Sequence, residues 1–376
     1  MDINSVNITF TGDLNISGTF EPNIMSDNEI FCNELLCEFR RSDFVVCNLE
    51  GPATLAEFKD TTQTVIKSPR KTINYLSRRN IKVFNFANNH IFDANDVGVD
   101  DTIQEIEKQE SFYFGIKTNK NDAVKIIEKN GVKIGLIGIA HTFPNKSGNY
   151  SIPEKSFTRI RKLVKKLHSR TDHIVVNFHG FEEFTLYPSP IKRKFLQKIA
   201  SLKKVSVVIA HHSHTFQGFE FIQKTPIFYS LGNFVFDIPN HKMYDYVDSG
   251  ALVRFQFRKT DFSFDFVPFN MANGFVKKSN YEAFINHLYQ ISDFSNYKRK
   301  WRKEAHRVLF RKNNPKIEAQ KEGETLQNSN VFKMLFTKKF YQKCKMILGD
   351  KTMFSVYTNA IYEEIINKFS SKNRSV

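Results

Sequence analysis

The stretch "VSVVIAHHSHTFQG" (residues 205–218) indicates the fold, because it joins an apolar strand to a cluster of histidines. Val205–Ala210 is apolar enough to be a strand buried on both faces. Such a strand usually gives way to turn residues, but here His211, His212 and His214 follow within four positions. Side chains at i and i+2 of an extended segment point the same way, so we expect His212 and His214 to face one point. Converging imidazoles favour a metal site, and an exposed histidine-rich loop is the alternative.

The length and composition are those of a soluble globular protein. The 376 residues allow one large domain with an extension, or two domains, and 41% are hydrophobic. We find no apolar run near the about 20 residues needed to cross a bilayer, and no secretory signal. The four cysteines form no CxxC pair. We therefore expect reduced thiols and a cytoplasmic location, with peripheral contact at the inner membrane face as an option.

The positive charge is concentrated in the last quarter of the chain. Of the net charge of +16, residues 271–376 carry +12, because they hold 21 Lys and Arg against 9 Asp and Glu. Such a region favours an anionic partner, and we expect contact with a membrane surface or an acidic polymer. Nucleic acid is the least favoured partner, since no nucleic-acid-binding module is recognisable.

Alternating apolar strands and amphipathic helices through about residue 270 predict an α/β fold. The expected strands are Val6–Thr11, Phe44–Leu49, Lys82–Ala87, Lys133–Ile139, His173–Phe178 and Val205–Ala210. The expected helices are Asn28–Arg40, Val97–Gln109, Ser156–His168 and Ile191–Leu202. Asn130-Gly131 lies between two alternating runs and predicts a hairpin, because both turn positions need positive φ. After Pro226 the pattern indicates mainly strands.

The character of the sequence changes near residue 271, so we predict two parts, 1–270 and 271–376. The second part is basic and mainly helical, with a polar linker expected at 313–330 and helices near 331–348 and 355–369. Aromatic residues are interleaved with its basic residues, namely Tyr297, Trp301 and Phe310. A solvated basic face and a binding surface are both consistent with this pattern.

Five of the apolar strands end in side chains that can bind metal. These side chains are Asp13, Glu50, Asn88 with Asn89 and His90, His179, and His212 with His214. Open α/β sheets place their ligand sites at the carboxyl ends of strands. A single Asn or Asp there is usually a turn former, but five such strand ends in one chain favour a shared site.

The chemistry of this set suits one or two divalent cations. Carboxylates can bridge two ions, and neutral imidazoles and amide oxygens can complete the coordination. Two carboxylates opposite two dications leave a net positive site, which suits a phosphate-like anion and lowers the pKa of a bound water. His90, beside Asn89, would be free to act as a general acid.

Several motifs together resemble one known family. They are "FTGDLN", "NLEGP", "FNFANNHIFDANDVGVDDT", "HGFEE…YPSP", "AHHSHTFQGFE" and "PIFYSLGNFVFD". In this order they resemble the CapA family of poly-γ-glutamate capsule biosynthesis, within the calcineurin-like metallophosphoesterase superfamily. The resemblance covers about residues 6 to 270 and not the basic C-terminal quarter. It implies a four-layer α-β-β-α sandwich with metals, Mn, Fe or Zn, at the strand ends.

The resemblance also implies roles for individual residues. The implied metal ligands are Asp13 and His214 for the first ion, Glu50 as the bridge, and Asn89, His179 and His212 for the second ion. His90 would protonate the leaving group, and Asp93 would orient His90 or cap the following helix. Most of the superfamily has Asp-x-His in the first motif, but this chain has Asn15 at the third position, so the first ion has one imidazole fewer.

Three further residues are candidates for contact with substrate. Glu183 fits a carboxylate in the "HGFEE" segment, and the alternative is a surface glutamate. Asn233 of "YSLGNF" either lines the site or only forms a tight bend. For His211, packing within the fold is favoured over binding metal.

Our leading hypothesis is a metal-dependent hydrolase of a phosphoester, or of an anionic polymer, in capsule or cell-surface polymer biosynthesis. The alternative is a non-catalytic accessory protein that scaffolds polymer synthesis at the membrane surface through the basic region. A nuclease ranks third.

Overall fold

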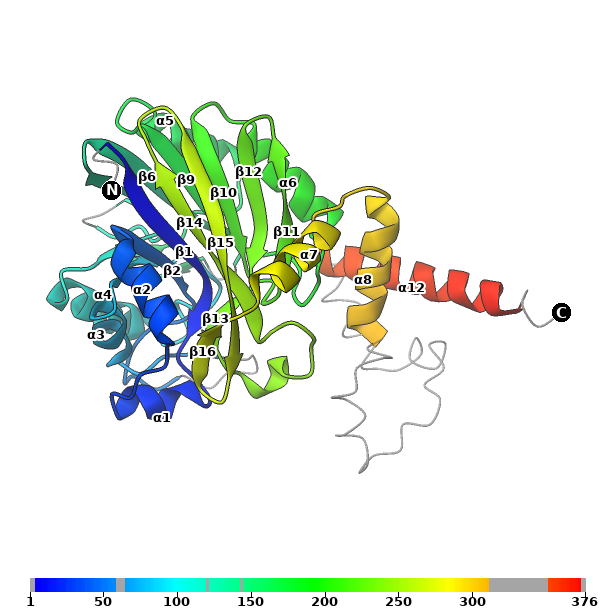
Figure 1. Cartoon of the computed structure of the whole chain (residues 1–376), viewed down its shortest axis with the longest axis horizontal. Helices are drawn as coiled ribbons and strands as arrows, with labels where there is room; N and C mark the ends of the chain where they lie inside the picture. Colours follow the sequence, from blue (N-terminus) through cyan, green and yellow to red (C-terminus); the bar gives the residue numbers. More distant parts are fainter. Residues whose placement is uncertain (1–3, 59–64, 120–121, 143–144, 311–350, 373–376) are drawn as a thin grey trace.

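Two β-sheets pack face to face, and helices cover their outer faces (Figure 1). The computed structural model describes residues 4–58, 65–119, 122–142, 145–310 and 351–372. The larger sheet runs β16 (Phe275–Lys278), β15 (Phe262–Ala272), β14 (Ser249–Phe257), β1 (Val6–Asn15), β2 (Phe44–Leu49), β3 (Ile81–Asn85) and β4 (Phe112–Phe114), with β13 (Asn233–Phe236) beside β1. The smaller sheet runs β11 (Phe216–Ile222), β12 (Thr225–Leu231), β10 (Val205–His211), β9 (His173–His179), β6 (Val132–Ala140) and β5 (Val124–Lys129).

The described residues stack in four layers. Between the sheets, Phe10 and Phe255 of the larger sheet pack in one buried cluster with Val175 and Val207 of the smaller sheet. The outer face of the larger sheet is covered by α1 (Phe20–Met25), α2 (Asn33–Arg41), α3 (Thr72–Ser77) and α4 (Asn95–Lys108). The outer face of the smaller sheet is covered by α5 (Phe157–Leu167) and α6 (Pro190–Ala200). The predicted α-β-β-α sandwich is therefore confirmed.

Strand direction places the carboxyl ends of the strands that carry the predicted ligands at one side of the molecule. β1, β2 and β3 are parallel neighbours, and so are β6, β9 and β10. β9 is buried at every position, which explains why the residues between its two histidines are apolar except for the buried Asn177. Side chains at the ends of these strands in both sheets can therefore meet.

Local sequence signals also match the structure. Asn130 and Gly131 join β5 to β6 with φ of 54° and 73°, so the predicted hairpin is confirmed. The hydroxyls of Ser156 and Ser189 accept hydrogen bonds from Arg159 N and Lys192 N, which begins α5 and α6 where the pattern expected helices.

The structure extends the larger sheet past residue 270, the predicted boundary. That residue lies inside β15, and the sheet continues through β16 to Lys278. Three helices among the described residues follow: α7 (Tyr281–Ile291), α8 (Tyr297–Phe310) and α12 (Lys351–Lys372). The expected linker at 313–330 and helix near 331–348 lie outside the described residues, whereas α12 contains the last expected helix.

Two of the three interleaved aromatic residues, Tyr297 and Trp301, are not exposed, and the side chain of Phe310 lies outside the described part of the chain. Trp301 is 1% exposed and packs with Ala305 of α8 and with Val356 and Ala360 of α12. Tyr297 donates a hydrogen bond to the carbonyl oxygen of Pro188. Packing within the fold thus explains Tyr297 and Trp301. Among the described helices, none combines the length and apolar character that a membrane span requires.

Candidate metal centre

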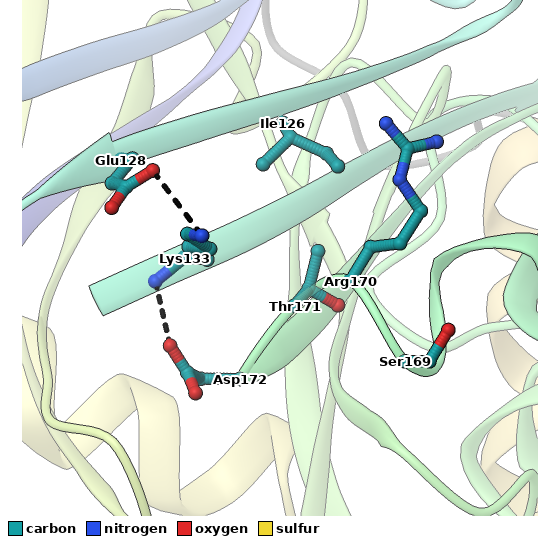
Figure 2. Close-up of a pocket in the computed structure, with 7 residues that line it drawn as sticks. All are labelled: Ile126, Glu128, Lys133, Ser169, Arg170, Thr171 and Asp172. Carbon is teal, nitrogen blue, oxygen red and sulfur yellow. Dashed lines mark hydrogen bonds and ion pairs between the residues drawn. The ribbon is translucent and has the colours of Figure 1, made fainter. Parts of the chain in front are cut away.

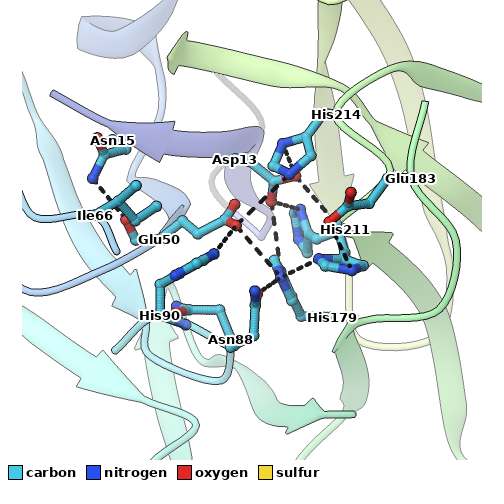
Figure 3. Close-up of polar contacts among 12 residues, drawn as sticks. Asp13, Asn15, Glu50, Ile66, Asn88, His90, His179, Glu183, His211 and His214 are labelled. Carbon is cyan, nitrogen blue, oxygen red and sulfur yellow. Dashed lines mark hydrogen bonds and ion pairs between the residues drawn. The ribbon is translucent and has the colours of Figure 1, made fainter. Parts of the chain in front are cut away.

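The ends of β1, β2, β9 and β10 and the loop after β3 bring the predicted ligands together (Figure 3). Asp13, Glu50 and His179 are completely buried. Glu50 Oε1 lies 3.7 Å from His179 Nε2 and 3.9 Å from His214 Nε2. Asp13 Oδ2 lies 3.8 Å from His214 Nδ1. Residues that are up to about 200 positions apart in sequence therefore share one buried cluster.

Close backbone contact fixes the position of Asp13. Its N–H donates to the carbonyl oxygen of Gly232, at 2.9 Å. A Cβ atom at residue 12 would lie 1.9 Å from that same oxygen, so only glycine fits beside Asp13. Gly232 itself has φ of 76°, in the region that favours glycine. The glycines of "FTGD" and "SLGNF" thus allow β1 to approach the turn before β13.

His212 and His214 converge, but not because they lie in an extended strand. β10 ends at His211, and the next residues turn through left-handed conformations, with φ of 82° at His212 and 58° at His214. The expectation of an extended segment was wrong here. The N–H of His212 donates to Asp13 Oδ2 at 3.0 Å, which holds this strained turn against β1. Non-glycine residues with positive φ are costly and are concentrated at functional sites.

The ligand atoms form three overlapping groups in which all atoms lie within 4.8 Å of one another. The groups are Glu50 with His179 and His212, Asp13 with Glu50 and His214, and Glu183 with His212 and His214. Asn89 joins the first group, since its Oδ1 lies 2.6 Å from His179 Nε2. The first two groups correspond to the two sets that the resemblance implies, with Glu50 common to both.

The carboxylate of Glu50 shows that a cation fits. Both of its oxygens are buried, and neither accepts a hydrogen bond from any described residue. Burial, followed by the nearby charges of Asp13, Glu183 and Asp93, raises the pKa of Glu50 well above its usual value. A buried carboxylate without a partner is strongly disfavoured, and a divalent cation is the group that would satisfy it.

The imidazoles are in the form that binds metal. Burial lowers the pKa of His179 and His214 well below the usual range and that of His212 to about 3, so the three rings are neutral. Burial alone would raise the pKa of Asp13, but hydrogen bonding and charge from His211, together with His214, lower it. A carboxylate beside neutral imidazoles is a typical ligand set for Mn, Fe or Zn.

Asparagines orient the ligands. Asn48 Nδ2 lies 2.8 Å from Asp13 Oδ1 and 3.1 Å from His179 Nδ1. Asn233 Oδ1 lies 2.8 Å from His214 Nδ1. Such partners fix ring orientation and tautomer in metal sites. Sequence reasoning missed Asn48, although its place two residues before Glu50 in β2 puts it on the same side of the strand as Glu50.

His90 and Asp93 form a pair at the edge of the cluster. His90 Nδ1 lies 2.7 Å from Asp93 Oδ2, which also accepts a hydrogen bond from the N–H of Ile66. His90 Nε2 lies 3.9 Å from Glu50 Oε1, and the side chain is 18% exposed. Asp93 therefore orients His90 toward the cluster, and the helix cap considered for Asp93 is not formed, since α4 begins without a side-chain cap.

The three substrate candidates occupy different positions. Glu183 Oε1 lies 3.4 Å from His212 Nε2, and the side chain is 44% exposed at the mouth of the site. Asn233 is buried behind His214. His211 is also buried, with Nδ1 3.4 Å from Asp13 Oδ1, and it does not line the cleft. Asn15 turns away from the cluster and donates to the backbone oxygen of Glu50 at 2.9 Å.

A cleft of about 340 Å³ leads to the cluster. Glu50, His90, Glu183 and His214 line its polar side. The opposite wall, which the sequence analysis missed, consists mainly of the apolar residues Phe184, Phe236, Ile238, Met243 and Tyr244, together with Asn240 and His241. Phe236 is the last residue of β13, and the others lie in loops and a short 3-10 turn beyond strand ends, where no periodic pattern indicates which way a side chain points.

A second hollow, of about 550 Å³, lies at the start of β9 (Figure 2). It is lined by Arg170 and Asp172 and by the ion pair of Lys133 with Glu128, 3.7 Å apart. The seven residues of β9 separate it from His179, at the other end of the strand. All the candidate metal groupings of the described residues lie at the first site.

The fold and site define an α-β-β-α protein with a buried carboxylate–imidazole centre suited to divalent metal. The model of the family "Bacterial capsule synthesis protein PGA_cap" matches residues 7–238, and the chain belongs to that family. The capsule biosynthesis protein CapA of Bacillus anthracis is 28% identical over 266 residues, covering 67% of this chain and 64% of that protein. The chain thus spans less than two thirds of that relative's length. The PGA biosynthesis protein CapA of Bacillus subtilis is 28% identical over 291 residues, covering 72% and 73%.

Solved structures of phosphatases are similar in outline. A phosphatase from Mycoplasma pneumoniae is 12% identical, with a TM-score of 0.47, over 78% of this chain and 99% of that one. The calcineurin-like phosphoesterase YfkN from Bacillus subtilis is 14% identical, with a TM-score of 0.39, over 73% and 88%. These values are too low to argue from, and the layers and site described above define the fold.

Proposed function

We propose that the protein is a metal-dependent phosphoester hydrolase in capsule or cell-surface polymer biosynthesis. The observation that carries this proposal is the buried Glu50 carboxylate, whose oxygens lack hydrogen-bond partners among the described residues and lie between imidazoles. Membership of a capsule synthesis family supports the biological setting. The substrate would be an anionic phosphoester, which a net positive centre attracts.

The ligands divide between two positions. Asp13 and His214 would hold one ion, Asn89, His179 and His212 a second, and Glu50 would contact both. A divalent cation supplies Lewis-acid polarisation of a phosphoryl oxygen and lowers the pKa of water. Mn, Fe and Zn all suit this ligand set.

The chain's own groups would manage the proton on the leaving oxygen. Asp93 holds Nδ1 of His90, so that Nε2 faces the cleft and can donate a proton to that oxygen. Glu183, at the mouth, would contact the substrate or its water.

The proposal is tested by loading the purified chain with Mn²⁺ and assaying phosphomonoesters and phosphodiesters with an unactivated phenyl leaving group, which needs a proton from a general acid. We expect turnover that chelation abolishes, and a loss of about a hundredfold or more in kcat for His90→Gln, with bound metal unchanged. Asp13→Asn should lose both metal and turnover.

His168→Gln is the matched control, because His168 is exposed at the end of α5, before the start of β9, whereas the cluster lies at the other end of that strand. Its kcat should equal that of the unmodified chain. Turnover that persists in both His90→Gln and Asp13→Asn would come from a contaminant, and no turnover with any ester would contradict the proposal.

A second candidate is a non-catalytic accessory role at the membrane surface. Asn15 favours it, because its side chain binds the backbone of Glu50 and leaves the first metal position one imidazole short. Exposed basic residues of α8, namely Lys298, Arg299 and Lys303, could contact anionic lipid. Salt-sensitive binding to phosphatidylserine vesicles by a metal-free protein without turnover would support this role instead.

A further inference from the structure

The apolar wall of the cleft is built from rings that stack on one another. The rings of Phe184 and Tyr244 are parallel, with centroids 3.7 Å apart. Phe184 also stacks on His214, at 5.6 Å, and meets the edge of His241, at 4.9 Å. The wall therefore touches a proposed metal ligand directly, through the ring of Phe184.

The loop that carries Phe184 forms buried hydrogen bonds with the segment from Ser213 to Gln217. The carbonyl oxygen of Thr185 accepts hydrogen bonds from Thr215 Oγ1 at 2.8 Å and from Gln217 Nε2 at 2.9 Å. The N–H of Phe184 donates to the carbonyl oxygen of Ser213 at 2.7 Å. Phe184 has φ of 61°, a conformation that persists in a non-glycine residue only when its surroundings enforce it.

The same loop also forms hydrogen bonds with α8. The N–H of Leu186 donates to Glu304 Oε2 at 2.9 Å, and Arg307 donates to the carbonyl oxygen of Phe184 at 2.9 Å. Glu304 is only 9% exposed and pairs with Arg307 at 2.9 Å. α8 lies outside the residues that the family model matches, 7–238.

Arg307 contacts both chain segments that supply the stacked rings, the one with Phe184 and the one with Tyr244. Besides the carbonyl of Phe184, its guanidinium lies 3.4 Å from Asp245 Oδ2, and Asp245 follows Tyr244 directly in the chain. One planar, multidentate cation thus sets the spacing between the segments that present Phe184 and Tyr244. Figure 1 shows α8 on the side of the sandwich where β11, an edge strand of the smaller sheet, lies.

We infer that Arg307, with Glu304, is a positioning residue that shapes the cleft for a ring-bearing organic phosphate. The phosphoryl group would lie at the Glu50–His214 side, and the ring would pack against Phe184 and Tyr244. Aromatic side chains prefer to stack on or meet the edge of other rings. Of the neighbouring lining residues, Phe236, Ile238 and Met243 are apolar and Asn240 is polar. This inference rests on the proposed function and adds a substrate class.

Binding of two phosphonates to the Mn²⁺-loaded full chain, measured by calorimetry, tests the inference. Phenylphosphonate and methylphosphonate share a head group but differ in the ring. We expect phenylphosphonate to bind about tenfold more tightly to the unmodified chain. In Arg307→Met that preference should nearly disappear, while the Kd for methylphosphonate and the bound metal stay the same.

Arg302→Met is the matched control. Arg302 lies on the same helix but pairs with Glu363 of α12, at 3.4 Å, rather than with the loop. It should keep the tenfold preference. The emission of Trp301, the single tryptophan, reports whether α8 remains packed in both variants.

A double-mutant cycle separates positioning from general destabilisation. If Arg307 acts through the wall, Arg307→Met should add almost nothing in the background of Tyr244→Leu, because the wall is already broken. The inference would be overturned if the losses of ring preference in the two variants were additive. Equal affinity of the unmodified chain for the two phosphonates would also overturn it. Neither result would contradict the proposed hydrolase. If neither phosphonate binds the metal-loaded chain, both proposals fail.

Discussion

At the scale of single residues, burial of His173 makes the stability of the fold depend on pH. His173 begins β9, where Nδ1 lies 2.8 Å from Ser206 Oγ and Nε2 lies 2.5 Å from the carbonyl oxygen of Arg258. Burial lowers its pKa, helped by Lys204, against opposing effects of the Arg258 carbonyl and of Asp172 and Asp261. The neutral ring is therefore the native form.

The unfolded chain then binds more protons than the folded chain once pH falls below about 6.5, and stability declines. The free energy of unfolding of the unmodified chain should therefore fall between about pH 7.5 and about pH 5.5. In His173→Gln this fall should be smaller, by up to about 1 kcal/mol. Urea unfolding at each pH measures this. The exposed His168→Gln should decline like the unmodified chain, and an equal decline in His173→Gln would disprove the effect.

The sequence predicted the cluster because its residues stand at strand ends, and Asp13, Glu50, Asn89, His179, His212 and His214 do meet. It did not predict the opposite wall. Phe184 is placed by left-handed backbone and by a contact to α8, and Tyr244 is placed beside Asp245, which pairs with Arg307 of α8. None of these causes has a periodic signature in the chain. Asn15, which has the right position, turns away because the Glu50 carbonyl accepts its amide N–H.

At the scale of secondary structure, strands buried on both faces were the easiest to predict. Phe44–Leu49 was predicted with the bounds that the structure shows, and most of the other expected strands are within a few residues. Short elements were missed, such as β4, with three residues, and α3, with six. Such elements are too short to show a period and depend on tertiary packing.

The β5–β6 hairpin tests whether its turn depends on glycine. Gly131 has φ of 73°, and a Cβ there would meet nothing within 4 Å, so only backbone strain opposes a substitution. Gly131→Ala should lower the free energy of unfolding by about 1 kcal/mol. Glu128→Ala, which removes only an exposed ion pair on the same hairpin, should change it by less than about 0.5 kcal/mol. Equal effects in urea unfolding would refute the turn argument.

At the scale of the whole molecule, the C-terminal helices should unfold together with the sandwich. Tyr297, Glu304 and Arg307 bind the backbone of the loop at 184–188, and Trp301 is buried between α8 and α12. We expect Trp301 emission and far-ultraviolet circular dichroism to give one coincident urea transition. An earlier transition in Trp301 emission would show that these helices unfold independently.

The metal centre is the claim on which the function depends, and anomalous scattering from crystals of the Mn²⁺-soaked chain tests it most directly. We predict an anomalous peak beside Glu50, within coordination distance of His179 and His212, and its loss in Glu50→Gln crystals. A second, weaker peak at Asp13 and His214 is expected, since Asn15 supplies no ligand there. Crystals that diffract well, contain Mn²⁺ in the soak and show no peak at Glu50 would contradict the metal centre.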